Sequence, residues 1–402
     1  MTHLYLKKGR DESLRRFHPW VFSGAIGGIE GPDPAEGDVV LVHTAHKECL
    51  GWGHYQIGSI AVRMLSFDPS EKPVTDAAFW RGRLQRCLEA RRTFGLASAP
   101  VTNCYRLVHG EGDGLPGLII DWYDGVCVLQ AHSAGMFRAR ADIASALREI
   151  YGDDLLAVYD KSEGTAPFKA GLDLGDGYLW QAAAGAGACP RTVLENGHQF
   201  LVDWENGQKT GFFLDQRDNR ALVERYARGR RVLNLFCYTG GFSVYALAGG
   251  AVSVDSVDSS ARAIELVEQN VTLNFGPSAP HRALCCDAID FVKAAPKDAY
   301  DLMIVDPPAF AKHRGALSNA LRAYQRLNAA AISAVAPGGL IFTFSCSQVV
   351  DREAFSLAIF SAAAETGRAV RIIGRLGQPA DHAVNIYHPE GAYLKGLVLY
   401  VE

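Results

Sequence analysis

Several features of specialised protein classes are missing from this sequence. Its nine cysteines form no C-x-x-C pair and no secretory signal opens the chain, so we expect neither structural disulfides nor a cysteine-based zinc site. No apolar run approaches the length that spans a bilayer. These absences predict a reduced, cytoplasmic protein with no bound metal and no membrane contact.

The overall charge of the chain is also low. With 40 basic and 44 acidic residues the formal net charge is −4, so any contact with RNA or DNA requires local basic patches. The 402 residues exceed what one small core can hold. We predict three domains, which span residues 1–70, 71–190 and 191–402.

The first predicted domain has the pattern of a small β-barrel. Short apolar runs at residues 4–6, 38–43, 50–55 and 60–65 are separated by glycine and proline clusters, which is typical of strands and turns. The segment containing HPWVFSGAI resembles a PUA domain, an RNA-binding module. Its first loop sets cations beside aromatic residues, as an RNA-contacting surface would, but a solvated basic loop beside core aromatics explains the pattern equally well. The residues concerned are Lys7, Lys8, Arg10, Arg15, Arg16, His18, Trp20 and Phe22.

The second predicted domain is a compact α+β unit. An arginine-rich helix over residues 77–94 precedes elements in the order strand, strand, helix, strand. The arginines either follow RNA phosphates or form a solvated face. His109, Glu111 and Asp113 occupy a glycine-rich turn. Turn chemistry explains them better than metal binding, because no second ligand cluster accompanies them.

The third predicted domain begins with a strand, a glycine turn and a helix. Residues 232–236 form an apolar run typical of a buried parallel strand, and Gly240 and Gly241 follow it. A second strand, over residues 251–257, is followed by Asp258. Glycines let a ligand approach the backbone, and an acid in this position accepts hydrogen bonds from a ribose diol. The pattern therefore predicts a nucleoside ligand.

The identity of that nucleoside follows from what the turn omits. The turn lacks the third glycine of the dinucleotide fingerprint G-x-G-x-x-G, and no Walker lysine is present. The turn is therefore not suited to bind the pyrophosphate of a dinucleotide. S-adenosylmethionine fits better, and a glycine turn that only permits close helix packing is the alternative. The residues predicted to bind this cofactor are Gln216, Phe236, Tyr238, Thr239, Gly240, Gly241, Asp258, Ser259, Asp287 and Asp306.

Further alternation of helices and strands predicts a doubly wound parallel sheet, whose ligands lie outside the carboxyl ends of its strands. Asp306 follows one such strand and precedes Pro307 and Pro308, which form a rigid platform for a planar base, together with Phe310. Cys346 follows the next strand. A thiolate there can add to carbon 6 of a pyrimidine and make carbon 5 nucleophilic, although a free cysteine is most often a small core residue.

Several motifs together resemble the RlmI-type large-subunit ribosomal RNA cytosine-5 methyltransferases, and the similarity extends over nearly the whole chain. The resemblance implies a Rossmann-like class I methyltransferase domain behind a PUA-like barrel and a central α+β domain. It also implies S-adenosylmethionine as methyl donor, large-subunit ribosomal RNA as partner and Cys346 as nucleophile. The motifs are QKTGFFLDQRD from Gln208, LFCYTGGFS from Leu235, DPPAF from Asp306, FSCS from Phe344 and PEGAYLKG from Pro389.

One departure concerns the carbon-5 proton. Many RNA cytosine-5 methyltransferases carry a second cysteine beside their D-P element, where this chain has Pro307 and Pro308. We therefore predict Asp306 as the proton acceptor. The leading hypothesis is an enzyme that forms 5-methylcytosine through a covalent adduct of Cys346.

Three alternatives stay open at this point. A uridine-5 methyltransferase would use the same thiol chemistry. Guanine-N7 methyltransferases share the QKTG, DQRD and DPP motifs, but their reaction needs no thiolate. A noncatalytic RNA-binding protein with a relic cofactor pocket would be a different class of protein. The sequence does not indicate which nucleotide is modified. It allows a homodimer but does not determine the oligomeric state.

Overall fold

The computed structural model describes residues 1–167, 170–311 and 313–402. Its internal contacts divide the chain into two compact units, and each is described by itself. The first unit comprises Met1–Val193, Val202–Leu214 and Ala380–Gly391. The second comprises Leu194–Leu201, Asp215–Pro379 and Ala392–Glu402. The division into three domains at residues 70 and 190 stays a prediction.

A six-stranded sheet forms the N-terminal part of the first unit, in the order β2-β6-β5-β4-β1-β3. Leu4, Val40 and Val62 are fully buried and belong to its hydrophobic core. The predicted strands are confirmed, and β2 and β3 are additional. The strands are β1 (Thr2–Leu6), β2 (Trp20–Phe22), β3 (Ile26–Glu30), β4 (Val39–His43), β5 (Cys49–Tyr55) and β6 (Ile60–Ser66).

Acidic residues partly neutralise the basic segment between β1 and β2, which includes the short helix α1 (Glu12–Arg15). Arg15 forms ion pairs with Asp11, at 2.7 Å, and with Glu48. Arg16 forms an ion pair with Glu12. For these two arginines the structure favours the interpretation of a solvated, internally paired loop. Contact of this loop with RNA stays a prediction.

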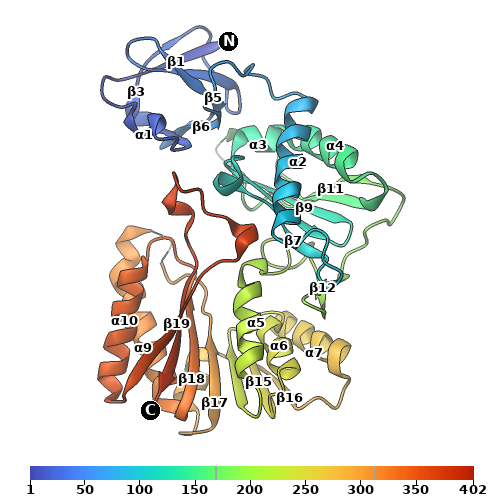
Figure 1. Ribbon diagram of the computed structural model, residues 1–402, viewed down its shortest axis with the longest axis vertical. Coiled ribbons are helices and arrows are strands. Elements are labelled where there is room, and N and C mark those ends of the chain that lie inside the picture. The colour runs from blue at the N-terminus through green and yellow to red at the C-terminus, as the bar shows by residue number, and fades with distance from the viewer. Residues whose placement is uncertain (168–169, 312) are drawn as a thin grey trace. The chain divides into compact units, whose positions relative to one another are not determined.

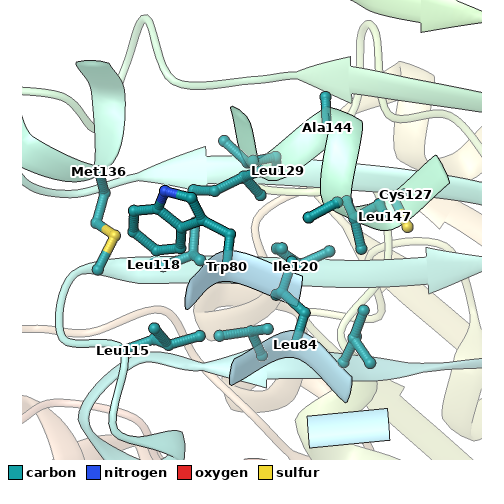
Figure 2. Packing of buried hydrophobic residues seen from close by; sticks show 14 of the residues in the cluster. Trp80, Leu84, Leu115, Leu118, Ile120, Cys127, Leu129, Met136, Ala144 and Leu147 are labelled. Carbon is teal, nitrogen blue, oxygen red and sulfur yellow. The ribbon is translucent and has the colours of Figure 1, made fainter. Parts of the chain in front are cut away.

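A five-stranded sheet, in the order β11-β10-β9-β8-β7, packs with helices in residues 77–181 of the first unit. Figure 2 shows its core, in which Trp80 and Leu84 of α2 lie among Leu118, Ile120 and Leu129 of the strands. The predicted α+β arrangement is confirmed. The elements are α2 (Ala77–Thr93), β7 (Cys104–His109), β8 (Leu118–Tyr123), β9 (Val126–Ala131), α3 (Ala134–Arg138), α4 (Arg140–Tyr151), β10 (Ala157–Asp160) and β11 (Gly177–Gln181).

The acids of the glycine-rich turn have structural partners. Arg91 of α2 is fully buried and donates to both carboxylate oxygens of Asp113, at 2.6 and 2.7 Å. Asp113 also accepts from the backbone N–H of His109, and Glu111 accepts from the indole N–H of Trp20 at 2.9 Å. These contacts agree with the prediction that the turn is structural, and they remove Arg91 from the arginines that could follow phosphates.

A seven-stranded sheet, in the order β16-β15-β14-β17-β18-β20-β19, organises the second unit. The five strands from β16 to β18 are parallel, as predicted. Beyond the strands expected from the sequence, β20 runs antiparallel to both of its neighbours. The strands are β14 (Arg231–Leu235), β15 (Ser253–Asp258), β16 (His281–Cys285), β17 (Tyr300–Val305), β18 (Val335–Ser345), β19 (Val370–Leu376) and β20 (Lys395–Val401).

Helices cover both faces of this sheet, with α5, α6 and α7 on one side and α9 and α10 on the other (Figure 1). The central strands are therefore buried on both faces, which explains why Leu233, Met303 and Ile341 occur in nearly continuous apolar runs. No helix among the described residues is long and apolar enough to cross a membrane. The helices are α5 (Arg217–Tyr226), α6 (Gly241–Ala248), α7 (Ala261–Phe275), α8 (Ala288–Ala294), α9 (Leu317–Ala334) and α10 (Arg352–Thr366).

A buried ion pair anchors α5 in the second unit. Arg220 donates from two guanidinium nitrogens to the two carboxylate oxygens of Glu195, at 2.8 and 2.7 Å. The hydroxyl of Tyr245 donates to the same carboxylate at 3.0 Å. Glu195 is the last residue of β12 (Arg191–Glu195), which forms a hairpin with β13 (His198–Val202).

This pair predicts a large stability effect. Glu195→Ala should lower the free energy of unfolding by about 3–5 kcal/mol, because Arg220 would be left buried without its counter-charge. Urea unfolding followed by circular dichroism measures the change. Glu265→Ala is the matched control, since its pair with Arg262 is solvent-exposed, and it should change stability by less than about 1 kcal/mol. Equal effects of the two substitutions would contradict the prediction.

Candidate functional site

The candidate residues of the second unit gather at one edge of the seven-stranded sheet. β14 pairs in parallel with β15 and β17, and β17 pairs in parallel with β18, so the carboxyl ends of these strands lie at the same edge. Asp258 ends β15, and Asp306 directly follows β17. Cys346 directly follows β18. The sheet thus brings Asp258 and Cys346, which are 88 positions apart in the sequence, to the same edge.

The loop after β14 has an unusual backbone. Phe236 and Tyr238 adopt left-handed conformations, with φ of 58° and 47°, although neither is a glycine. Such conformations cost of order 1 kcal/mol or more each and concentrate at ligand sites. Gly240 also has positive φ, 79°, and a Cβ atom there would lie 3.0 Å from Cγ1 of Val267. At Gly240 the loop therefore exposes its backbone without a side chain, so that a ligand could approach it closely.

Asp258 fixes this loop to the end of β15. One carboxylate oxygen accepts from the backbone N–H of Tyr238 at 3.0 Å, and the other accepts from the backbone N–H of Ser260 at 2.9 Å. The amide of Asn270 donates to the carbonyl oxygen of Thr239 at 2.8 Å. Each carboxylate oxygen keeps a further lone pair for a hydroxyl donor. A strained glycine loop with an acid at its rim fits a nucleoside, and Ser259 is exposed beside that acid.

Asp287 lies at the start of α8 and has a structural role there. One of its carboxylate oxygens accepts from the backbone N–H groups of Ile289 and Asp290, at 2.8 and 2.9 Å, which caps the helix. The residue is exposed. Its predicted contact with the cofactor stays a prediction.

Gln216 holds the carboxylate of Asp306. Its side-chain amide donates to Asp306 at 2.9 Å, and its carbonyl oxygen accepts from the side chain of Asn219 at 2.6 Å. Gln216 and Asn219 are both buried. The orientation of the Asp306 carboxylate is therefore set by a chain of amide hydrogen bonds, which the sequence did not reveal.

The residues that follow Asp306 differ in exposure. Pro307 is buried, whereas Pro308 is exposed. The ring of Phe310 packs against the ring of Tyr324 with 4.8 Å between centroids. Of the three residues predicted to contact a base, Pro308 is thus the one most open to solvent.

Cys346 is half-buried between two serines that hold its loop. The hydroxyl of Ser345 donates to the hydroxyl oxygen of Tyr324 at 2.9 Å, and the hydroxyl of Ser347 donates to the carbonyl oxygen of Ala311 at 2.7 Å. Burial raises the pKa of Tyr324 to about 12, and the neighbouring charges of Cys346 and Asp306 add to this shift. Tyr324 therefore lies within electrostatic reach of both candidate catalytic groups and is protonated at neutral pH.

The other cysteines at this edge are less suited to nucleophilic attack. Cys237 is buried in the cofactor loop, and burial together with the charge of Asp258 raises its pKa well above the usual value. The pKa of Cys286, which follows β16 and is mostly exposed, is also raised, by partial desolvation and by the charges of Cys285 and Asp287. A protonated thiol is a poor nucleophile. These environments argue against Cys237 as the rival of Cys346.

Sequence reasoning missed Asn219, Tyr324 and Lys395 as parts of this edge. Asn219 and Tyr324 look like ordinary members of amphipathic helices, and neither lies in a recognisable motif position. Lys395 carried a usable signal, because it opens the strongly apolar strand β20 and is itself buried. A lysine is rarely fully buried unless it has a partner.

Residues 177–395 match the S-adenosylmethionine-dependent methyltransferase family, and residues 4–67 match a PUA-like domain. Two relatives named ribosomal RNA large subunit methyltransferase I, from Pseudoalteromonas translucida and Aeromonas hydrophila, are each 39% identical over 98% of both chains. The chain belongs to the ribosomal RNA large subunit methyltransferase I family. Its methyl donor is S-adenosylmethionine.

Solved structures support the fold of this methyltransferase. SMU.776, a methyltransferase complexed with SAH, has a TM-score of 0.84 and 25% identity over the whole of both chains. A methyltransferase from Streptococcus mutans aligns with a TM-score of 0.82 at 24% identity, again over both full chains, and it shows the fold alone. The predicted class I methyltransferase fold with an N-terminal PUA-like domain is confirmed.

Asp258 gives a direct test of the cofactor site. Asp258→Ala should weaken the binding of S-adenosylhomocysteine at least about tenfold, because it removes the predicted acceptor for the ribose and releases the backbone of Tyr238. Isothermal titration calorimetry measures this affinity. Asp255→Ala on the same strand is the matched control, since Asp255 pairs with Arg282 and should not affect binding. Unchanged affinity of the Asp258 variant would remove Asp258 from the site.

Proposed function

We propose that this methyltransferase forms 5-methylcytosine in large-subunit ribosomal RNA. The substrate class is supported by the names of its relatives and by the PUA-like domain. The chemistry is supported by one observation above all, the half-buried thiol of Cys346 at the end of the strand next to the one that leads to Asp306. Methyl transfer to a ring nitrogen needs no such thiol.

The proposed reaction begins with the thiolate of Cys346. The sulfur adds to carbon 6 of the flipped-out cytosine, and the electron pair of the 5,6 double bond moves to carbon 5, which becomes nucleophilic. When bound, S-adenosylmethionine supplies a methyl group from its sulfonium. After carbon 5 has taken the methyl group, a base removes the carbon-5 proton. The electrons of that bond restore the double bond and expel the thiolate of Cys346.

The remaining candidate residues have binding roles in this proposal. Asp258 accepts from the ribose of the cofactor, Gly240 and Gly241 leave room for its methionine portion, and Asp287 lies on the adenine side. Asp306 receives the target base and takes the carbon-5 proton, and the hydrogen bond from Gln216 orients its carboxylate. The other proposed contacts are Phe236, Tyr238, Thr239 and Ser259 for the cofactor and Pro307, Pro308 and Phe310 for the base.

A uridine-5 enzyme is the nearest alternative, because the addition of a thiolate to carbon 6 serves uracil equally well. The product decides between the two. Ribosomal RNA incubated with the enzyme and labelled S-adenosylmethionine should yield labelled 5-methylcytidine on nucleoside analysis. Labelled 5-methyluridine or 7-methylguanosine as the sole product would overturn the cytosine assignment. We expect this reaction to take place in the cytoplasm.

Cys346 provides the mutational test. Cys346→Ala should lower turnover at least about a thousandfold, because the substitution removes the nucleophile, and it should leave the affinity for S-adenosylhomocysteine unchanged. Cys286→Ala is the matched control, since it also removes a thiol that follows a strand at this edge, and it should retain turnover. Full activity of the Cys346 variant would exclude the covalent mechanism.

A further inference from the structure

A buried lysine lies beside the loop that carries Cys346. Lys395 opens β20, and its backbone is paired with that of Ser345, the residue before Cys346. Only 3% of Lys395 is exposed. Removing an ammonium group from water costs several kcal/mol unless other groups compensate it. A charge in this position therefore requires a specific reason.

The Cys346 loop wraps around this ammonium group. Nζ of Lys395 donates to the carbonyl oxygens of Ser347 and Val350, in both cases at 2.5 Å. Two of the three ammonium protons are thereby fixed by the loop that begins with the proposed nucleophile. Within the described part of the chain, no carboxylate forms an ion pair with Lys395. Neutral carbonyl groups solvate the charge without cancelling it.

The positive charge of Lys395 acts on Cys346. Burial lowers the pKa of Lys395 to about 8, so the ammonium form prevails at neutral pH, and the charge of the Cys346 thiolate opposes this lowering. The interaction is reciprocal, because a thiolate that stabilises an ammonium group is stabilised by it to the same extent.

Other charged groups lie around the pair. Asp351 and Arg352, where α10 begins, act on Lys395 in opposite directions. Tyr324 of α9, which lies within electrostatic reach of Cys346, is a neutral phenol at neutral pH because burial raises its pKa to about 12. Asp306 follows the strand that pairs with β18, and its negative charge would disfavour a second negative charge at Cys346. Lys395 is a cation placed to offset that repulsion.

We propose that Lys395 is a positioning residue for the nucleophile, whose buried ammonium group fixes the Cys346 loop and favours the thiolate form of Cys346. This inference rests on the proposed role of Cys346 in catalysis. The thiol proton leaves to solvent before attack, and no other bond changes. The same charge stabilises the thiolate again when it is expelled from carbon 6 in the last step.

A purely structural role is the competing explanation. Lys395 would then only tie β20 to the loop, and its loss would slow turnover equally at all pH values. The charge hypothesis makes a different prediction, because a thiol that ionises at higher pH recovers its reactivity as the pH is raised.

The test compares the full-length wild-type protein with Lys395→Met and Lys395→Arg. Each protein is alkylated with iodoacetamide between pH 6 and 10 without RNA, and mass spectrometry follows the peptide that contains Cys346. In Lys395→Met, Cys346 should be alkylated at least about tenfold more slowly at pH 7. This corresponds to a rise of one unit in the pH at which its alkylation rate is half-maximal, the alkylation midpoint. Lys395→Arg, which keeps the positive charge, should keep a midpoint near that of the wild type. Cys285, exposed at the end of β16, is the internal control and should react equally in all three proteins.

Turnover supplies the second measurement. The activity of Lys395→Met should be low at pH 7 and should recover in part towards pH 9. An unchanged alkylation midpoint in Lys395→Met, or a loss of turnover that is the same at every pH, would overturn the inference. If Lys395→Met does not fold, the wild-type midpoint decides, since a value no lower than that of Cys285 would also overturn it. The wild type could have a lower alkylation midpoint than Lys395→Met while the Cys346→Ala variant stays active. That result would refute the proposed function and would leave the charge effect of Lys395 standing.

Discussion

The parallel pairing of β14 with β17 and of β17 with β18 is the constraint on which the candidate site depends. Neighbouring strands lie about 4.8 Å apart, so groups that follow adjacent strands can contact one planar base. Asp306 and Cys346 are in that relation. The glycine loop follows β14, one strand further along the sheet, and is therefore close enough to hold a methyl donor beside the same base. A slip in this pairing would separate the groups, even if each strand stayed intact.

The polar residues behind this edge give it a fixed geometry. Gln216 orients Asp306, Tyr324 accepts from Ser345, and Lys395 holds the carbonyl oxygens of the Cys346 loop. All these supporting side chains are buried, so their hydrogen bonds are shielded from competition with water. Groups that are oriented before the substrate arrives need not be reorganised during the reaction. The supporting residues thus matter to the site as much as those expected to touch the ligands.

Much of this arrangement could be predicted from the sequence, because buried parallel strands produce apolar runs. The run at residues 232–236 corresponds to β14 (Arg231–Leu235), and Pro307 marks the point where β17 has ended. The direction of β20 could not be predicted, since an antiparallel neighbour leaves the same apolar pattern as a parallel one. The left-handed conformations of Phe236 and Tyr238 were equally hidden, because neither residue type favours that conformation by itself. Lys395 shows a third limit, because the apolar strand marks this lysine as unusual but does not identify its partners, which are carbonyl groups 45 to 48 residues away.

The division of the chain has a consequence for taking the protein apart. The backbone passes from one unit to the other after residues 193, 201, 214, 379 and 391, so no single cut releases either unit whole. A fragment that starts at Asp215 would keep α5 but lose the hairpin residue Glu195, and with it the acid that compensates Arg220. It would also carry residues 380–391 without the unit to which they belong. The methyltransferase part is therefore not a detachable module, and the chain has to be produced as a whole.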